Sequence, residues 1–288
     1  MSSLVVNTNM SAIQTLNDLN ATNNAESTAI SRLSSGLQIQ NAATGPAQYV
    51  VSQALQSEAN GYGTAISNAQ DGVSMIQTVS GALSQISSIL QTMEQLALTS
   101  ANGATQTTTS LQANNSEFTD LKASITEIAK TTTFGTTPLL QGTATSHLAT
   151  GAFAASLQVG AFDTANEQIA LSISAVTSTA LKLKGATTVA ISSATKALSA
   201  VSAVQAAIKI VDGVASTVGA KQNELNAIVA NLTVGQQNLQ AANSQLVDVN
   251  MAQEMTTFST DQILMQSGVS MLAQAQQLPS LVLKLMGG

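Results

Sequence analysis

Apolar residues recur at steps of three and four through most of the chain, and this spacing predicts long helices. The clearest run lies between residues 46 and 100, and a second run lies between about 192 and 255. Uninterrupted patterns of this length are typical of helices that pack as coiled coils. The apolar positions are Ala69, Val73, Ile76, Val79, Leu83, Ile86, Leu90, Met93 and Ala97 in the first run, and Leu198, Val201, Val204, Ile208, Val211, Ala215, Val218, Leu225, Val229, Leu232, Leu239 and Leu246 in the second.

Two shorter helices are predicted at residues 4–40 and at about 111–130. Between the first of these and the long run, residues 41–45 indicate a break. Pro46 then suits the first turn of a helix, where its missing N–H is not needed. Residues 99–110 contain Asn102-Gly103 and several threonines, which predicts a loop.

Residues 131–175 differ in character, with more Gly, Thr and Pro. Residues 156–160 and 168–173 carry short alternating or β-favouring runs, and the residues between them are typical of a turn. We therefore expect a small β-hairpin near 150–175. Residues 176–190 show no clear pattern.

The last 27 residues, 262–288, contain a single charge, Lys284, and a regular apolar spacing. Their apolar and small residues alternate steps of four and three, an average of 3.5, which keeps one side of a helix facing a partner helix. Pro279 is expected to bend this terminal helix. We call the spaced set the terminal seam: Leu264, Gly268, Met271, Ala275, Leu278, Val282 and Leu285.

The order of elements predicts a mainly α fold: a long antiparallel helical bundle or coiled coil with a small β-hairpin element. The simplest packing returns the C-terminal half antiparallel along the N-terminal half, so that both termini lie at one end. We expect residues 1–42 and 256–288 to form one terminal coiled-coil domain. Residues 43–255 would then form a helical core domain that carries the hairpin near 150–175.

Charged residues are scarce, at 8% of the chain, and the net charge is −6. With only nine Lys and Arg, no basic face for nucleic acid can form. Ser, Thr, Asn and Gln replace the usual charged surface. We interpret this as a surface that meets identical copies, because a charge repeated at every symmetry-related contact would repel itself. The chain has no cysteine, which excludes disulfides.

Neither a secretory signal nor a membrane span is expected. The first 31 residues carry only Asp18 and Glu26 as charges, with no basic region and no unbroken apolar block. Residues 262–283 are free of charge and long enough to cross a bilayer, but several glutamines and Pro279 interrupt them. Their apolar residues also form a seam, which favours helix packing.

No catalytic centre, metal site or cofactor site is evident. His147 is the only histidine, and although Ser146 precedes it, neighbouring side chains in a polar loop rarely align for proton transfer. One histidine, no cysteine and scattered carboxylates provide no metal ligand set, and no glycine loop precedes a Gly-Lys-Ser/Thr. We therefore expect an assembly protein that is not an enzyme and binds no cofactor.

Arg32 is the only arginine, and two interpretations stay open. It is either an exposed helix charge of little energetic weight, or it forms a specific pair with a carbonyl or an acid on a neighbouring subunit.

In their shared order, several short motifs resemble bacterial flagellin over nearly the whole chain. Near the N-terminus these are Val6-Asn7-Thr8-Asn9 and Arg32-Leu33-Ser34-Ser35-Gly36. The middle of the chain adds Asn68-Ala69, Asp71-Gly72, Gly81-Ala82-Leu83, Phe134-Gly135, Leu139-Leu140 and Gln158-Val159-Gly160. The C-terminal half adds Gly219-Ala220, Gln222-Asn223, Leu225, Gln262-Ile263-Leu264, Gln266, Gly268, Leu272-Ala273-Gln274-Ala275, Gln277, Pro279 and Val282-Leu283.

The resemblance implies the structural subunit of the bacterial flagellar filament, a secreted protein that serves motility. It implies export through the flagellar type III apparatus, a terminal domain lining the filament channel, and a helical homopolymer that other flagellins can share. Implied partners are the export apparatus, an export chaperone, and the filament cap and hook-junction proteins. Only about 20 residues separate the hairpin from the returning helix, so we expect no outer variable domain.

Two alternatives of function stay open: a hook–filament junction protein, and an exported helical protein that inserts into membranes. Under the filament interpretation, the first 40 and last 30 residues or so are expected to become ordered only on assembly. The residues expected to pack between subunits are Arg32, Leu33, Leu37, Leu264, Met271, Ala275, Leu278, Val282 and Leu285.

Overall fold

The computed structural model describes residues 8–142, 152–162, 164, 167–183 and 189–286, without the side chains of Ala152 and of 278–286. Contacts divide the chain into two compact units. Unit 1 comprises Met1–Ser57 and Asn238–Gly288, and unit 2 comprises Glu58–Gln237. The domain boundaries expected from the sequence, after residues 42 and 255, stay a prediction.

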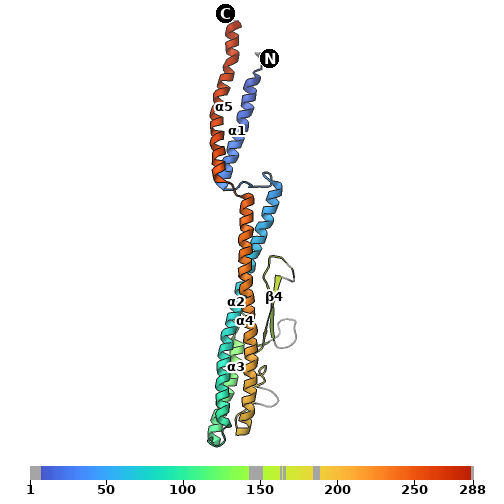
Figure 1. Cartoon of the computed structure of the whole chain (residues 1–288), viewed down its shortest axis with the longest axis vertical. Coiled ribbons are helices and arrows are strands. Elements are labelled where there is room, and N and C mark those ends of the chain that lie inside the picture. The colour runs from blue at the N-terminus through green and yellow to red at the C-terminus, as the bar shows by residue number, and fades with distance from the viewer. Residues whose placement is uncertain (1–7, 143–151, 163, 165–166, 184–188, 287–288) are drawn as a thin grey trace. The chain divides into compact units, whose positions relative to one another are not determined.

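Helices dominate the described chain, as predicted (Figure 1). Residues 175–193, between the last strand and the fourth helix, add no large insert, so the expected absence of an outer domain is confirmed. The helices are α1 (Met10–Ser35), α2 (Pro46–Ala101), α3 (Thr108–Thr131), α4 (Ala194–Val247) and α5 (Met251–Met286), and the strands are β1 (Thr133–Phe134), β2 (Thr137–Pro138), β3 (Ala152–Gln158) and β4 (Gln168–Ser174).

The first helix is shorter than predicted, because it has a defined cap at each end. The Asn9 side chain accepts a hydrogen bond from the Ala12 N–H at 3.1 Å, which satisfies one of the first free donors of the helix. At the other end, Gly36 adopts a left-handed backbone (φ 74°) and ends α1, so residues 37–40 are not helical. Pro46 begins α2, as predicted, and the loop expected at 99–110 is confined to the residues between Ala101 and Thr108.

The break between α4 and α5 was not predicted. The sequence pattern continued one helix to residue 255 and began the terminal helix near 262. Instead α4 ends at Val247 and α5 begins at Met251. The reason is tertiary, because after the last helical bond of α4, from the Asp248 N–H to the Ser244 carbonyl, the backbone bonds to residues 36–38. The Val247 carbonyl accepts from the Gln38 N–H at 2.7 Å, and the Val249 N–H donates to the Gly36 carbonyl at 2.9 Å. The bend expected at Pro279, which lies within α5, stays a prediction.

In unit 1, α1 and α5 run side by side, with the two chain ends at the same end of the pair (Figure 1). Their antiparallel register is fixed by contacts at both ends. The Asn9 amide donates to the Ala275 carbonyl at 2.7 Å, and Arg32 Nη1 lies 3.5 Å from Glu254 Oε1. This arrangement agrees with the predicted antiparallel return of the C-terminal half.

In unit 2, α2, α3 and α4 share one hydrophobic core with the hairpin (Figure 1). Of the nine apolar positions predicted for the long second helix, Val73 is half-buried and the other eight are buried. The stripe predicted for α4 is wrong at two positions. Leu198 is 64% exposed and Ala215 is exposed, while Ala197, Ala200 and Val214 occupy the core. The pattern alone could not separate the buried alanines, Ala197 and Ala200, from alanines on the surface.

The predicted hairpin is confirmed as β3 and β4, paired antiparallel from Ala152↔Ser174 to Gln158↔Gln168. Along β4, Ile169, Leu171 and Ile173 are buried and alternate with exposed residues, which is the pattern of a strand with one covered face. The Asn68 amide donates to the Gln158 carbonyl at 3.1 Å and attaches the end of β3 to α2.

Two glycines inside α2 have opposite surroundings. A Cβ on Gly61 would lie 2.6 Å from the Ala161 Cβ and 3.1 Å from its Cα, so the helix and the chain after β3 approach too closely for any side chain. A Cβ on Gly81 would meet no atom within 4 Å.

The substitution Gly61→Ala is expected to lower the unfolding free energy of unit 2 by about 1–3 kcal/mol, because the contacting atoms belong to backbone and Cβ and cannot rotate away. The matched change Gly81→Ala is expected to raise it by about 0.5–1 kcal/mol, the usual gain of alanine over glycine in a helix. Urea unfolding of the monomer, followed by circular dichroism, measures both. Equal stability of the two variants would show that the contact at Gly61 relaxes freely.

Candidate subunit-packing surface

The motif Arg32-Leu33-Ser34-Ser35-Gly36 lies at the end of α1, beside the connection from α4 to α5. Gly36 donates its N–H to the Arg32 carbonyl at 2.8 Å and turns the chain out of the helix. Leu37 then forms an antiparallel bridge with Asp248. We call this pairing of residues 36–38 with 247–249 the backbone joint. A residue with a Cβ is strained at φ 74°, which accounts for glycine at this position.

Arg32 forms an ion pair within its own chain. The guanidinium lies 3.5 Å from Glu254, whose side chain is 12% exposed against 31% for Arg32. Arg32 Nε is buried and has no hydrogen-bond partner. The bond to Glu254 fixes one of the two ends of the α1–α5 pair. A pair to a neighbouring subunit stays a prediction.

The other predicted packing residues fall into three groups. Leu33 and Leu37 are half-buried near the backbone joint, and Ala275 is buried beside Asn9. Leu264 and Met271 are 51% and 56% exposed. Leu278, Val282 and Leu285 lie in α5, but their side chains are outside the described residues. The terminal seam is therefore divided: some members face α1 and others face away from it.

The faces that α1 and α5 turn toward each other mix large apolar, small and polar residues. On α1, the buried and half-buried positions are Ala12, Thr15, Leu19, Thr22, Glu26, Ala29, Arg32 and Leu33. On α5, they are Glu254, Phe258, Asp261, Met265, Gly268, Leu272 and Ala275. Gly268 lies so close to α1 that a Cβ there would be 3.0 Å from Leu19 Cδ1, and the Oδ2 atom of the buried Asp261 has no hydrogen-bond partner. Among the described apolar residues of the two helices only Ala29 and Ala275 are buried, so the pair gains less from the hydrophobic effect than the core of unit 2 does.

Other large apolar side chains of α1 and α5 are left in contact with water. Sequence reasoning identified only two of them as packing residues, because it assigned one seam to α5 and could not tell which side α1 covers. Together they form what we call the exposed stripe: Met10, Ile13, Leu16, Ile30, Met251, Met255, Ile263, Leu264, Val269 and Met271, between 45% and 67% exposed. Large apolar side chains left exposed in this number are typical of an interaction surface.

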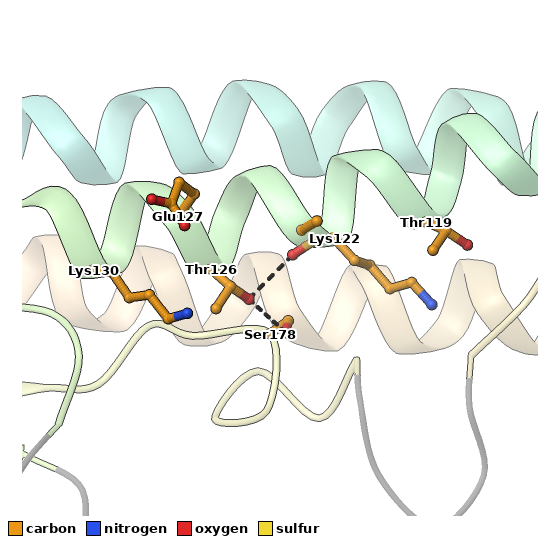
Figure 2. A pocket seen from close by; sticks show the side chains of 7 residues that line it. Thr119, Lys122, Thr126, Glu127, Lys130 and Ser178 are labelled. Carbon is orange, nitrogen blue, oxygen red and sulfur yellow. Dashed lines mark hydrogen bonds between the residues drawn. The ribbon is translucent and has the colours of Figure 1, made fainter.

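Unit 2 has a hollow of about 360 Å³ that is lined by residues of α3 and Ser178 (Figure 2). Figure 2 shows its polar residues along α3, opposite Ser178. The Thr126 and Ser178 hydroxyls are hydrogen-bonded to each other at 2.7 Å, and the Lys122 ammonium donates to the Val189 carbonyl at 2.7 Å. These groups hold the segment after β4 against α3, which is a structural role.

One tyrosine has a shifted pKa. Burial raises the pKa of Tyr62, and the nearby Glu58 and Glu167 carboxylates raise it further. The phenol therefore stays neutral and offers no nucleophile at neutral pH. Among the described residues no cluster of three or more metal-ligating side chains is found. Ser146 and His147 lie outside the described residues.

Family models describe both ends of the chain. Residues 6–145 match the bacterial flagellin N-terminal helical region, and residues 201–286 match the bacterial flagellin C-terminal helical region. A flagellin of Halalkalibacterium halodurans is 37% identical over 98% of this chain and 100% of its own length. The chain belongs to the bacterial flagellin family.

Other relatives of this flagellin agree over the same extent. A flagellin of Bacillus subtilis is 36% identical over 98% of this chain and 99% of its own. Flagellin FlaB2 of Treponema pallidum is 32% identical over 98% of this chain and 100% of its own. The resemblance inferred from the motifs is thus confirmed.

Membership in this family fixes the function. This flagellin is the filament subunit of a bacterial flagellum, a structural protein without enzymatic activity that is exported to the extracellular filament and polymerises with itself. In the described part of the chain, one helix, α4, is long and apolar enough to cross a membrane by length and composition alone. Several of its apolar residues pack in the core of unit 2.

The backbone joint is expected to lose stability when Gly36 is replaced. A Cβ at Gly36 would meet no atom within 4 Å, so only backbone strain opposes substitution. Gly36→Ala is expected to destabilise the joint by about 1–2 kcal/mol, whereas Gly36→Asn should cost less, because asparagine tolerates the left-handed backbone better. The melting temperatures of filaments made from each variant measure this difference. Equal melting of the two variants would exclude backbone strain as the constraint at this glycine.

Proposed function

We propose that each subunit leaves the exposed stripe of α1 and α5 to be covered by neighbouring copies of the same chain. One observation carries the proposal: ten large apolar side chains of these two helices are between 45% and 67% exposed in the single chain. We further propose that the terminal domain of 1–42 and 256–288 orders fully only in the filament. The nine predicted packing residues would then make contacts both within and between subunits. They are Arg32, Leu33, Leu37, Leu264, Met271, Ala275, Leu278, Val282 and Leu285.

The free energy gained by covering the exposed stripe is large enough to support assembly. Burying one large apolar side chain completely stabilises a structure by about 1.5–3 kcal/mol. Each member of the stripe is already about half covered, so covering the rest contributes roughly 1 kcal/mol per residue, or roughly 10 kcal/mol for ten. Association costs on the order of 4–15 kcal/mol in lost freedom. The free energy gained by covering the stripe therefore offsets the cost of association. Further contacts from several neighbours then make filament growth favourable.

The polar content of the two helices supports the same interpretation. Between Met10 and Ser35, α1 carries only Asp18, Glu26 and Arg32 as charges, and Arg32 is already paired with Glu254. A helix surrounded by copies of itself meets its own charges at short distance, so few unpaired charges can be tolerated. Uncharged Asn, Thr and Ser keep such a surface soluble in the monomer without repelling the copies in the polymer.

The exposed stripe also bears on the other proteins that this subunit would contact. Before assembly its apolar residues need protection from premature association, which an export chaperone would provide by binding α5 or α1. Export through the flagellar type III apparatus requires an unfolded chain, and a weakly packed α1–α5 pair unfolds at little cost. The filament cap and the hook-junction proteins would then contact the same terminal helices at the two filament ends.

Two other functions are less well supported. A hook–filament junction protein would share the terminal helices, but this chain matches filament flagellins over 98% of its length. A membrane-inserting protein would place an uninterrupted apolar helix at the surface, whereas many apolar residues of the candidate helix α4 pack in the core of unit 2.

Hydrogen exchange is expected to separate the two ends of the chain from unit 2. In the monomer, backbone amides of α1 and α5 should exchange at least about 100-fold faster than those of the buried part of α2, because local opening of a weakly packed pair costs little. In the filament, α1 and α5 should become protected. Mass spectrometry after exchange of both forms measures this, and strong protection of α1 and α5 in the monomer would contradict ordering on assembly.

Removing apolar surface from the stripe is expected to weaken growth. The double change Leu264→Gln and Met271→Gln should raise the subunit concentration needed for growth from filament seeds by roughly tenfold or more, since roughly 2 kcal/mol is lost and each 1.4 kcal/mol is a factor of ten. Sedimentation of seeded samples over a concentration series gives the value.

The matched control for this experiment changes two exposed polar residues of the same helix, Thr257→Gln and Thr260→Gln. The control adds the same side chain without removing large apolar surface, so growth should change by less than about threefold. An unchanged growth concentration in the Leu264 and Met271 variant would refute the proposal that these residues are covered in the filament.

A further inference from the structure

The methionines of this flagellin divide sharply between the two units. Of the nine in the sequence, seven have described side chains. In unit 2, Met75 and Met93 are 7% and 0% exposed. In unit 1, Met265 is half-buried, and four others are 48% to 66% exposed, all within the exposed stripe. These exposed methionines are Met10, Met251, Met255 and Met271.

We propose that the exposed methionines are modification sites at which peroxide oxidises the free subunit and prevents its addition to a filament. The inference rests on the proposed function, because it requires the stripe to be covered by neighbouring subunits. It adds a property of its own: the same thioethers are reactive in the monomer and shielded in the polymer. Sensitivity to oxidant is therefore confined to subunits that have not yet assembled.

The reaction is a two-electron oxygen transfer. The thioether sulfur attacks one oxygen of hydrogen peroxide, a new S=O bond forms, and the O–O bond breaks. The second peroxide oxygen takes up the remaining proton and leaves as water, so the sulfur is oxidised and the peroxide is reduced. Methionine sulfoxide is the product. No cysteine is present to compete for the oxidant, so the exposed thioethers are its principal soft targets.

The product is poorly suited to the interface. A sulfoxide replaces an apolar, adaptable side chain with a polar one that accepts hydrogen bonds. Donors to satisfy it are scarce on the stripe, whose other described members are Ile, Leu and Val. A polar group that becomes buried without a partner is unfavourable. Four such groups on two neighbouring helices should oppose subunit addition strongly.

The first experiment measures where oxidation occurs. Free subunits and sheared, washed filaments are treated with the same dilute hydrogen peroxide, digested, and analysed by mass spectrometry for a gain of one oxygen at each methionine. The exposed methionines should oxidise at least about tenfold faster in the free subunit than in the filament, since covered side chains exclude the oxidant. Met75 and Met93 serve as internal controls and should stay unoxidised in both forms.

The second experiment measures the consequence for growth. Peroxide-treated subunits, freed of peroxide, are added to untreated seeds. The concentration needed for growth should rise at least about tenfold, a loss of 1.4 kcal/mol by the relation between free energy and equilibrium constant. Treatment of the same subunits with the two methionine sulfoxide reductases, which act on the two sulfoxide epimers, should restore growth. Restoration excludes irreversible damage elsewhere as the cause.

The outcomes distinguish this inference from the proposed function. If untreated subunits fail to grow on seeds, the proposed function itself fails. If untreated subunits grow but oxidised subunits grow equally well, or if free subunits and filaments oxidise at equal rates, the role of the exposed methionines is refuted. Loss of growth that the reductases do not reverse would also refute it.

A variant gives an independent test. In the chain with Met10→Leu, Met251→Leu, Met255→Leu and Met271→Leu, growth after peroxide is compared with growth of the same variant without peroxide. This ratio should be close to one, against at least about tenfold for the parent chain, because leucine keeps the apolar surface and lacks the oxidisable sulfur. A variant that is as sensitive to peroxide as the parent would place the sensitive group elsewhere. If the variant grows poorly in both conditions, the parent chain with reductase rescue still decides the question.

Discussion

Two helices that pack side by side can cover only one face of each other, and this geometric limit governs the terminal part of the molecule. The shared face of the α1–α5 pair mixes apolar and polar residues, among them the half-buried Phe258, Gly268 and the buried Asp261. Ten other large apolar residues of the two helices stay 45% to 67% exposed. Our proposal is that this pair depends on additional surface, supplied by other copies of the same chain. The scarcity of charge on these helices is consistent with that environment.

Unit 2 solves the same problem differently. Its three helices and hairpin enclose one core, in which Ile76, Leu90 and Phe118 are completely buried. Because a third helix and a sheet close the faces that a pair would leave open, this unit has the contacts of an independently stable domain. The contrast supports the proposal that the terminal helices complete their packing on assembly, whereas unit 2 closes its core within one chain. It also explains the unequal exposure of the methionines.

The motif at the end of α1 acts through the backbone as much as through its side chains. Gly36 ends the helix in a left-handed conformation, and the next residues bond to the chain between α4 and α5. Arg32, one turn earlier, pairs with Glu254 in the first turn of α5. One short stretch thus specifies a helix end, a backbone joint and an ion pair within unit 1.

The sequence by itself determined the helical class, the hairpin, the start of α2 at Pro46, the absence of an outer insert and the family. Each of these depends on local chemistry or on periodicity: apolar residues every three or four positions, alternation in β4, and the fixed φ of proline. Even so, the sequence did not predict most of the exposed stripe as a packing surface, because a periodic pattern shows that a helix has an apolar side but not what faces that side.

Only the tertiary structure decided the rest. The break after Val247 is invisible in the pattern, because its cause is a set of hydrogen bonds to residues more than 200 positions away. The exposure of Leu198 and the burial of Ala197 were likewise undecidable, since alanine suits both surface and core. The partner of Arg32 and the division of the terminal seam depended on how α1 lies against α5. Long-range contact sets these features, and no window of local sequence contains both of its sides.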